Sequence, residues 1–170
     1  HRLSPEERMI GALREQLMLR FIFSVPGMPC IYYGDEAGME GCADPFCRRP
    51  YPWGHEDAQM LARYQAMTAM RNAHPVLRTG ECVYLAPCAD VLGVIRKNES
   101  GRDAFGSQAE NACAVTLINR SAKEVVVYLT AEDVCGAKTL VTDDGQTLSA
   151  RGGAFSVKVK GLQGMTGFAE

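Results

Sequence analysis

The segment that decides the fold reads Val25-Pro-Gly-Met-Pro-Cys-Ile-Tyr-Tyr-Gly-Asp-Glu-Ala-Gly-Met-Glu-Gly41, followed by Asp44-Pro-Phe-Cys-Arg-Arg-Pro-Tyr-Pro-Trp53. Its apolar run Cys30-Ile-Tyr-Tyr33 is typical of a strand that is buried on both faces. Gly34 begins a long loop, which is much richer in charged and aromatic residues than the chain as a whole, at 22% and 8%. Such loops often contact ligands. The loop residues in question are Asp35, Glu36, Glu40, Asp44, Arg48, Arg49, Tyr51 and Trp53.

The charge and its distribution argue against nucleic acid and membranes as partners. The 170 residues carry a formal net charge of −2, and the Lys and Arg residues are scattered along the chain. A nucleic-acid or anionic-membrane partner calls for a basic cluster, so we expect neither. The most apolar stretch, about 9–25, contains Arg14, Glu15 and Arg20, which argues against a membrane span. Because no signal peptide is visible, the expected location is cytoplasmic.

The cysteine and histidine residues do not indicate a metal site or a catalytic triad. The seven cysteines are odd in number and show no repeated spacing, so we expect reduced thiols. Cys42 and Cys47 are a conceivable zinc pair, but a structural zinc site needs a second pair, and none is evident. With three histidines, a Ser-His-Asp triad is also poorly supported. We therefore predict neither a metal nor a cofactor.

Two helices are predicted in the first half of the chain. Ser4-Pro-Glu-Glu7 combines a hydroxyl N-cap, a proline at the first helical position and a capping-box glutamate. The helix should extend to about Ser24, with an apolar stripe through Ile10, Leu13, Leu17 and Phe21. A second helix should begin after Glu56-Asp57 and end near Ala73, because Pro75 disfavours helical geometry in the residue before it.

From Thr79 the sequence changes to short β-branched and aromatic runs separated by turn residues, which is typical of a sheet protein. The segment Glu99–Asn111 should be a hairpin loop. The whole region is expected to form an antiparallel β-sandwich. Six or seven strands are predicted, at Glu81–Leu85, Val91–Arg96, Cys113–Asn119, Glu124–Leu129, Lys138–Thr142, Ala154–Lys160 and Met165–Ala169.

The quoted segment resembles glycoside hydrolase family 13, the α-amylase family, and within it the neopullulanase, cyclomaltodextrinase and maltogenic amylase group. The resemblance implies an α+β fragment, in which residues 1–79 are the carboxy-terminal part of a catalytic (β/α)₈ barrel and residues 80–170 are the β-sandwich called domain C. A complete barrel needs roughly 250 residues. In the family the three catalytic carboxylates lie on earlier strands, so no catalytic residue is expected in this chain.

Asp35 and Glu36 could be mistaken for a catalytic pair. Retaining glycosidases use two carboxyl groups about 5 Å apart that flank one bond. Adjacent residues that leave an extended strand point to opposite sides, which does not suit that geometry. We expect instead that one of these carboxylates accepts backbone or arginine donors and holds the loop in shape.

The substrate-binding candidates are Asp44, Arg48, Tyr51 and Trp53. Asp44 and Arg48 match the Asp-Pro-x-x-Arg positions that, by the resemblance, bind glucose hydroxyls. The alternative is that the two side chains pair only with each other. Tyr51 and Trp53 have aromatic rings that suit stacking on a sugar, although Trp53 is equally suited to plugging the barrel rim.

The function implied is that of a retaining α-glucan hydrolase acting on α-1,4 links, or also α-1,6 links, of maltodextrin, cyclodextrin or pullulan. The fragment alone should be inactive, and its barrel-facing apolar surface should favour self-association. The alternative is a non-catalytic β-sandwich module that binds carbohydrate or is purely structural. Residues 80–170 contain no tryptophan and two tyrosines, Tyr84 and Tyr128, which favours a structural role for that region.

Overall fold

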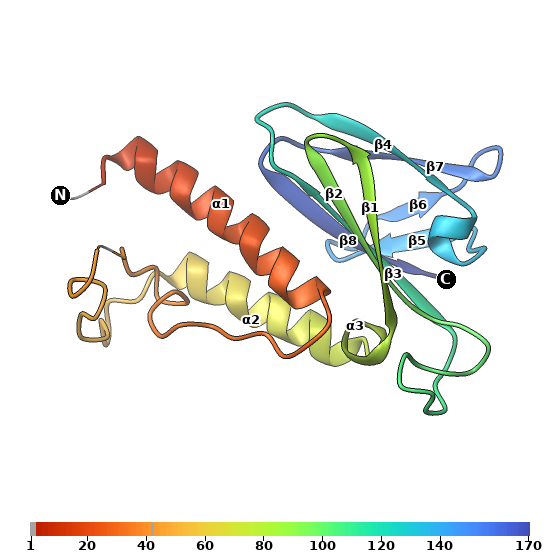
Figure 1. Cartoon of the computed structure of the whole chain (residues 1–170). Helices are drawn as coiled ribbons and strands as arrows, with labels where there is room; N and C mark the ends of the chain where they lie inside the picture. Colours follow the sequence, from red (N-terminus) through yellow and green to blue (C-terminus); the bar gives the residue numbers. More distant parts are fainter. Residues whose placement is uncertain (1–2, 42) are drawn as a thin grey trace.

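The computed structural model describes residues 3–41 and 43–170, and it divides into a helical part and an antiparallel sandwich (Figure 1). The helices are α1 (Pro5–Ser24), α2 (Ala58–Ala73) and the short α3 (Val76–Thr79). Helices α1 and α2 lie side by side and run in the same direction, and the segment 25–57 connects them by returning along both (Figure 1). No helix in the described part of the chain is long and apolar enough to cross a membrane.

Both long helices begin where their capping signals predict. Ser4 Oγ accepts a hydrogen bond from the Glu7 amide at 3.2 Å, and Glu7 Oε2 accepts one from the Ser4 amide at 2.8 Å. This reciprocal arrangement is the predicted capping box. In α2 the Asp57 carboxylate accepts from the amides of Gln59 and Met60. The predicted ends of these helices, at Ser24 and Ala73, are confirmed as well.

The predicted apolar stripe of α1 is only partly correct. Leu17 is buried, but the other fully buried apolar side chains of the helix are Leu19 and Phe23. The apolar side chains of Met9 and Met18 are 59% and 60% exposed. Helix α1 packs against α2 on one side and the sheet on another, so its buried residues follow two contact lines instead of one.

The strands occur close to the predicted positions. They are β1 (Glu81–Cys88), β2 (Val91–Asn98), β3 (Ala112–Asn119), β4 (Val125–Thr130), β5 (Thr139–Thr142), β6 (Thr147–Ser149), β7 (Ala154–Val159) and β8 (Gln163–Ala169). Strand β6 was not predicted, nor was the short 3₁₀ helix η1 (Glu132–Val134). The predicted loop at Glu99–Asn111 does connect the antiparallel strands β2 and β3.

Two antiparallel sheets make up the sandwich. The larger has the order β1-β2-β3-β8-β5-β6, and the smaller pairs β4 with β7. Their facing side chains form one apolar cluster that includes Val115, Leu117, Leu129 and Phe155, each at most 1% exposed. The predicted β-sandwich is therefore confirmed.

The predicted strand at Cys30–Tyr33 is wrong. These residues belong to no strand of the structure, and Ile31, Tyr32 and Tyr33 are 37%, 55% and 42% exposed. A strand is defined by backbone hydrogen bonds to a neighbouring strand, and within the described residues the eight strands pair only among themselves. The apolar run therefore lies along the helices in an irregular conformation.

A buried arginine joins the helical part to the sandwich. Arg96 of β2 is 1% exposed, and its guanidinium donates to the carbonyl oxygens of Ser24, Leu77 and Gly80 at 3.0, 2.7 and 2.7 Å. These carbonyls lie at the ends of α1 and α3, where backbone acceptors have no partner inside the helix. Burial lowers the pKa of Arg96. The buried cation is thus held by helix-terminal carbonyl dipoles.

A second set of polar contacts joins α1 to strands β3 and β8 of the large sheet and to the turn after β5. Arg20 forms an ion pair with Asp143 at 2.8 Å, and Arg20 Nη1 donates to Thr166 Oγ1 at 3.0 Å. Asp143 also accepts from the Thr166 amide at 2.9 Å. Thr116 Oγ1 then lies 3.1 Å from Thr166 Oγ1 and 3.0 Å from Ser24 Oγ. This network fixes the last turn of α1 on the sheet.

Candidate functional site

The candidate site lies in the segment 25–57, whose first turn is organised by Gly34. The Gly34 carbonyl accepts from the amides of Ala37 and Met39 at 3.1 and 2.9 Å. Gly34 has a φ of +94°, which is unfavourable for residues that carry a side chain. A Cβ at this position would lie 2.3 Å from the Met39 sulfur. Glu36 Oε2 accepts from the Gly34 amide at 2.9 Å. One of the two adjacent carboxylates therefore shapes the loop, as predicted.

Asp35 and Glu36 lie near two further polar residues that contact each other. Tyr64 of α2 donates its hydroxyl to Glu15 of α1 at 2.9 Å. Burial raises the pKa of the Glu15 carboxyl, with a smaller contribution from the negative charge of Asp35. Burial and the charge of Glu36 likewise raise the pKa of Asp35. Negative charge is thus concentrated where the loop meets the two helices.

An open hollow of about 620 Å³ lies between the segment and α2. Its lining includes Tyr33, Glu36 and Tyr64. This surface was not predicted from the sequence, because the helical spacing of Tyr64 from Met60 and Met67 is equally typical of a residue that only packs. The signal that could have found it is the tyrosine hydroxyl, which needs a polar partner when it is partly buried.

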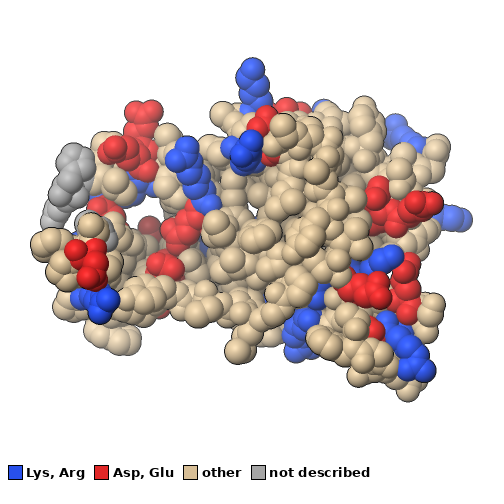
Figure 2. Space-filling view, viewed as in Figure 1, with Lys and Arg blue, Asp and Glu red and all other residues tan. Residues whose placement is uncertain are grey.

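The remainder of the loop is attached to the helices at several points. The Asp57 amide donates to the Ala37 carbonyl at 3.0 Å, which ties the loop to the start of α2. Tyr33 donates its hydroxyl to the Arg49 carbonyl at 3.0 Å, and Arg49 donates to the Glu40 carbonyl. Glu40 in turn forms an ion pair with Arg8 of α1. Figure 2 shows this end of the molecule, at the left of the view, with acidic and basic atoms close together.

Asp44 and Arg48 form an ion pair in the structure. Arg48 Nε lies 3.0 Å from Asp44 Oδ1, and the two side chains are 70% and 67% exposed. The Cys47 thiol donates to the same Asp44 oxygen at 3.7 Å. The two candidate ligand contacts therefore pair with each other, as the alternative interpretation requires, but their exposure leaves them accessible to a ligand.

Tyr51 and Trp53 form a tilted aromatic pair, with ring centroids 4.5 Å apart and an interplanar angle of 49°. Trp53 is 80% exposed, so its ring is open to solvent in this chain. Desolvation raises the pKa of the Tyr51 hydroxyl, and the charge of Glu36 together with a hydrogen bond to it adds to the rise. The four predicted substrate contacts are thus presented as two pairs on one exposed loop.

A metal centre is not formed by the described residues, because they contain no group of three His, Cys, Asp or Glu side chains placed to hold an ion. Cys47 is a free thiol. Its conceivable zinc partner, Cys42, lies outside the described residues.

The geometry of the site suits binding more than catalysis. An exposed guanidinium and carboxylate can hydrogen-bond to neutral hydroxyl groups, and the neighbouring aromatic rings can pack on an apolar face. Asp35 and Glu36 are engaged with the loop itself. The structure thus presents an exposed polar and aromatic surface beside the sandwich.

The fold of the chain is shared with solved α-amylase structures. The chain is similar to the crystal structure of an α-amylase from Geobacillus thermoleovorans complexed with acarbose, with a TM-score of 0.79 and 20% identity, over 94% of this chain and 33% of that one. A sandwich with preceding helices is therefore the arrangement found in the carboxy-terminal region of α-amylases. No family model matches the sequence.

Sequence relatives then identify the family. The chain is 33% identical over 170 residues to an amylopullulanase from Thermoanaerobacterium saccharolyticum, covering 95% of this chain and 13% of the relative. It is 43% identical over 72 residues to a cyclomaltodextrinase from a Bacillus species, covering 41% of this chain and 13% of the relative. The chain belongs to glycoside hydrolase family 13, the α-amylase family, as a carboxy-terminal portion of such enzymes.

Proposed function

We propose that this chain is the carboxy-terminal part of a retaining α-glucan hydrolase that acts on α-1,4 links of maltodextrin, cyclodextrin or pullulan, with α-1,6 links as a further substrate. The proposal rests on sequence similarity along almost the whole chain to an amylopullulanase. The chain spans only 13% of that relative, so the activity in this proposal is that of a longer enzyme.

In this proposal residues 1–79 complete a (β/α)₈ barrel and residues 80–170 form domain C. The parallel course of α1 and α2, joined by the segment 25–57, supports this assignment (Figure 1). The exposure of Tyr32 and Tyr33 is then explained by the neighbouring barrel strands that would cover them. Catalytic carboxylates would come from those earlier strands.

The loop that carries Asp44 and Arg48 supplies one wall of the substrate cleft. Charge-assisted hydrogen bonds to sugar hydroxyls contribute roughly 1.5–3 kcal/mol each. The ion pair between the two side chains orients Arg48 before the sugar arrives. Trp53, 80% exposed, and its neighbour Tyr51 offer stacking surface next to these groups.

The cleft proposal is tested by titrating maltohexaose into the chain and into Arg48→Ala. We expect the substitution to weaken binding by roughly tenfold or more, since one charge-assisted hydrogen bond is lost. Arg120→Ala is the matched control, because Arg120 is an exposed arginine of the sandwich that also pairs with a carboxylate. Equal, measurable affinity in the chain and Arg48→Ala would contradict the role given to Arg48.

A second test concerns catalysis. The isolated chain should not hydrolyse maltotriose or a nitrophenyl maltoside, because Glu36 is engaged with the loop backbone and, in this proposal, the catalytic carboxylates come from earlier strands. Turnover that disappears in Glu36→Gln would overturn this assignment of the carboxylates.

The alternative, a carbohydrate-binding or structural sandwich, can be separated from the main proposal. Tyr128 and Tyr84 are the exposed aromatic residues on sandwich strands, at 73% and 57%. If the sandwich binds glucans by itself, Tyr128→Ala should lower maltohexaose affinity while Arg48→Ala leaves it unchanged. A structural sandwich predicts the opposite for Tyr128→Ala, which should have no effect on affinity.

A further inference from the structure

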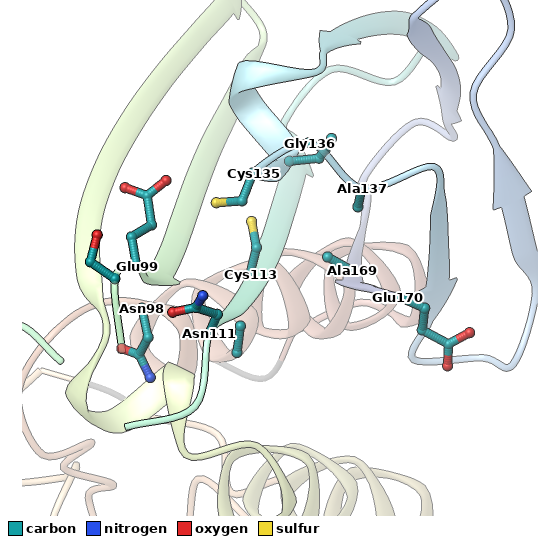
Figure 3. A pocket seen from close by; sticks show the side chains of 12 residues that line it. Asn98, Glu99, Asn111, Cys113, Cys135, Gly136, Ala137, Ala169 and Glu170 are labelled. Carbon is teal, nitrogen blue, oxygen red and sulfur yellow. The ribbon is translucent and has the colours of Figure 1, made fainter. Parts of the chain in front are cut away.

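Two cysteines meet at a hollow on the sandwich, far in sequence from the candidate cleft. The hollow, of about 620 Å³, opens between the ends of β2 and β3, the turn after η1 and the end of the chain. Figure 3 shows Cys113, from β3, and Cys135, from the turn after η1, with their sulfur atoms close together. Both side chains line the hollow.

The two thiols differ in their access to solvent. Cys113 is 3% exposed, belongs to the core cluster of the sandwich, and donates its thiol to the Asp133 carbonyl at 3.8 Å. Cys135 is exposed. A small molecule can therefore reach the Cys135 thiol more readily than the Cys113 thiol.

The backbone around Cys135 holds its side chain in place. Cys135 has a φ of +54°, in the left-handed region that residues with a Cβ seldom occupy. The turn is fixed by two hydrogen bonds, from the Cys135 amide to the Glu132 carbonyl at 3.3 Å and from the Gly136 amide to the Ala131 carbonyl at 2.7 Å. The direction of the Cys135 side chain, toward Cys113, is thus set by local structure.

Charged groups flank the pair. Lys97 forms an ion pair at 2.8 Å with Glu99, which lines the hollow. Burial raises the pKa of both thiols, and the positive charge of Lys97 opposes that rise. Since the thiolate is the reactive form, the reaction of this pair should be faster above neutral pH.

We propose that Cys113 and Cys135 are a redox-responsive pair that reacts with low-molecular-weight disulfides and closes an internal disulfide within the sandwich. The Cys135 thiolate attacks one sulfur of the small disulfide, forms a mixed disulfide and releases one small thiolate. The Cys113 thiolate then attacks Cys135 Sγ and expels the second small thiolate. Two protein thiols are oxidised, one small disulfide is reduced to two thiols, and the two protons of the protein thiols pass to the released thiolates.

The disulfide would join β3 of the larger sheet to the turn that follows β4 of the smaller sheet. The ring that it closes contains β4 and η1. Helix η1 contacts β3, and β4 contributes Val127 and Leu129 to the core cluster that also contains Val115 and Leu117 of β3. Cross-linking restricts the unfolded chain more than the folded one, which raises stability. Oxidation should therefore make the sandwich harder to unfold and leave the loop at 25–57 unaffected.

The test treats the reduced chain, at low concentration and pH 8, with oxidised glutathione. Mass spectrometry of an unreduced digest should show the peptides of Cys113 and Cys135 joined. The melting temperature should rise by roughly 4–8 °C and return to its original value with dithiothreitol. Cys88→Ser removes the exposed thiol at the end of β1 and should behave like the unaltered chain in both measurements.

Two variants separate the steps. Cys113→Ala should retain a stable glutathione adduct on Cys135, because the second thiolate is missing. Cys135→Ser should leave Cys113 unmodified, because that thiol is buried. In the unaltered chain, a lasting glutathione adduct on Cys135, a link to a different cysteine, a link between two chains or no reaction at all would each overturn the proposal, whether or not the variants fold.

Discussion

The sandwich buries its apolar side chains against one another, whereas the segment 25–57 leaves several of its own in solvent. Leu117 and Phe155 are at most 1% exposed, but Tyr32 and Phe46 are 55% and 68% exposed. Both regions contain aromatic and aliphatic residues, so composition does not separate them. The difference is that each strand of the sandwich finds its partners within the chain. The segment is held instead by turns and a few polar attachments.

Hydrogen exchange should show the largest contrast between the two regions. The amides of Val115 and Leu117 lie in β3, which is paired on both sides by β2 and β8. We expect them to exchange at least about 10³-fold more slowly than the amides of Tyr32 and Phe46, since local opening of the segment breaks few contacts. Amide exchange followed by mass spectrometry or NMR measures this. Comparable protection in both regions would show that the segment is as firmly packed as the sandwich.

Removing the buried guanidinium should have the next largest effect. Arg96→Met leaves the carbonyls of Ser24, Leu77 and Gly80 buried without their donor. We expect a loss of about 3–5 kcal/mol in the free energy of unfolding, measured by urea titration. Arg120→Met is the control, since Arg120 is 74% exposed in its side chain and should change stability by less than about 0.5 kcal/mol. Similar losses in the two variants would mean that Arg96 does not stabilise the joint.

The smallest effect concerns the ion pair that holds α1 on the large sheet. A double-mutant cycle with Arg20→Met and Asp143→Asn should give a coupling of about 1–2 kcal/mol, because the two side chains are only 15% and 17% exposed. The same cycle on the pair formed by Arg120 and Asp90 should give less than about 0.5 kcal/mol, since solvent screens that contact.

If the two double-mutant cycles gave equal coupling, the ion pair of Arg20 and Asp143 would stabilise the protein no more than an exposed surface pair does. The attachment of α1 to the sheet would then depend mainly on Arg96. A large coupling would show that the helical part and the sandwich unfold together. The result also shows whether the end of α1, where the segment 25–57 begins, is firmly attached to the sheet.

Local signals in the sequence predicted the features that depend on neighbouring residues. The cap at Ser4 and the start of a helix after Asp57 were predicted, and each of these side chains bonds to an amide two or three residues away. The β-branched runs likewise predicted seven strands of the sandwich. Strand β6 was missed because it has three residues and depends on pairing with β5.

Features that depend on distant residues were not predicted. Cys30–Tyr33 has the composition of a buried strand, but strand formation requires a neighbouring strand that the described residues do not provide. Arg96 was expected merely as the last residue of a strand. Its burial follows from carbonyls at positions 24, 77 and 80, whose convergence no local pattern reveals.

The candidate site shows the same division. The spacing of Asp44 and Arg48 permits their ion pair, and this was foreseen as an alternative. The contact between Glu15 and Tyr64 joins residues 49 positions apart and was not foreseen. Whether Asp44, Arg48, Tyr51 and Trp53 bind sugar stays a prediction.

The Arg96 joint also bears on how such a protein can be divided. A cut at residue 79, where the sequence changes character, would leave Arg96 in the sandwich and remove Ser24 and Leu77, two of its acceptors. A shortened chain beginning at residue 80 would expose a cationic side chain in what had been a dry interface. Transplanting the sandwich between relatives should therefore succeed only when both helices travel with it, so the exchangeable module is larger than the β-region alone.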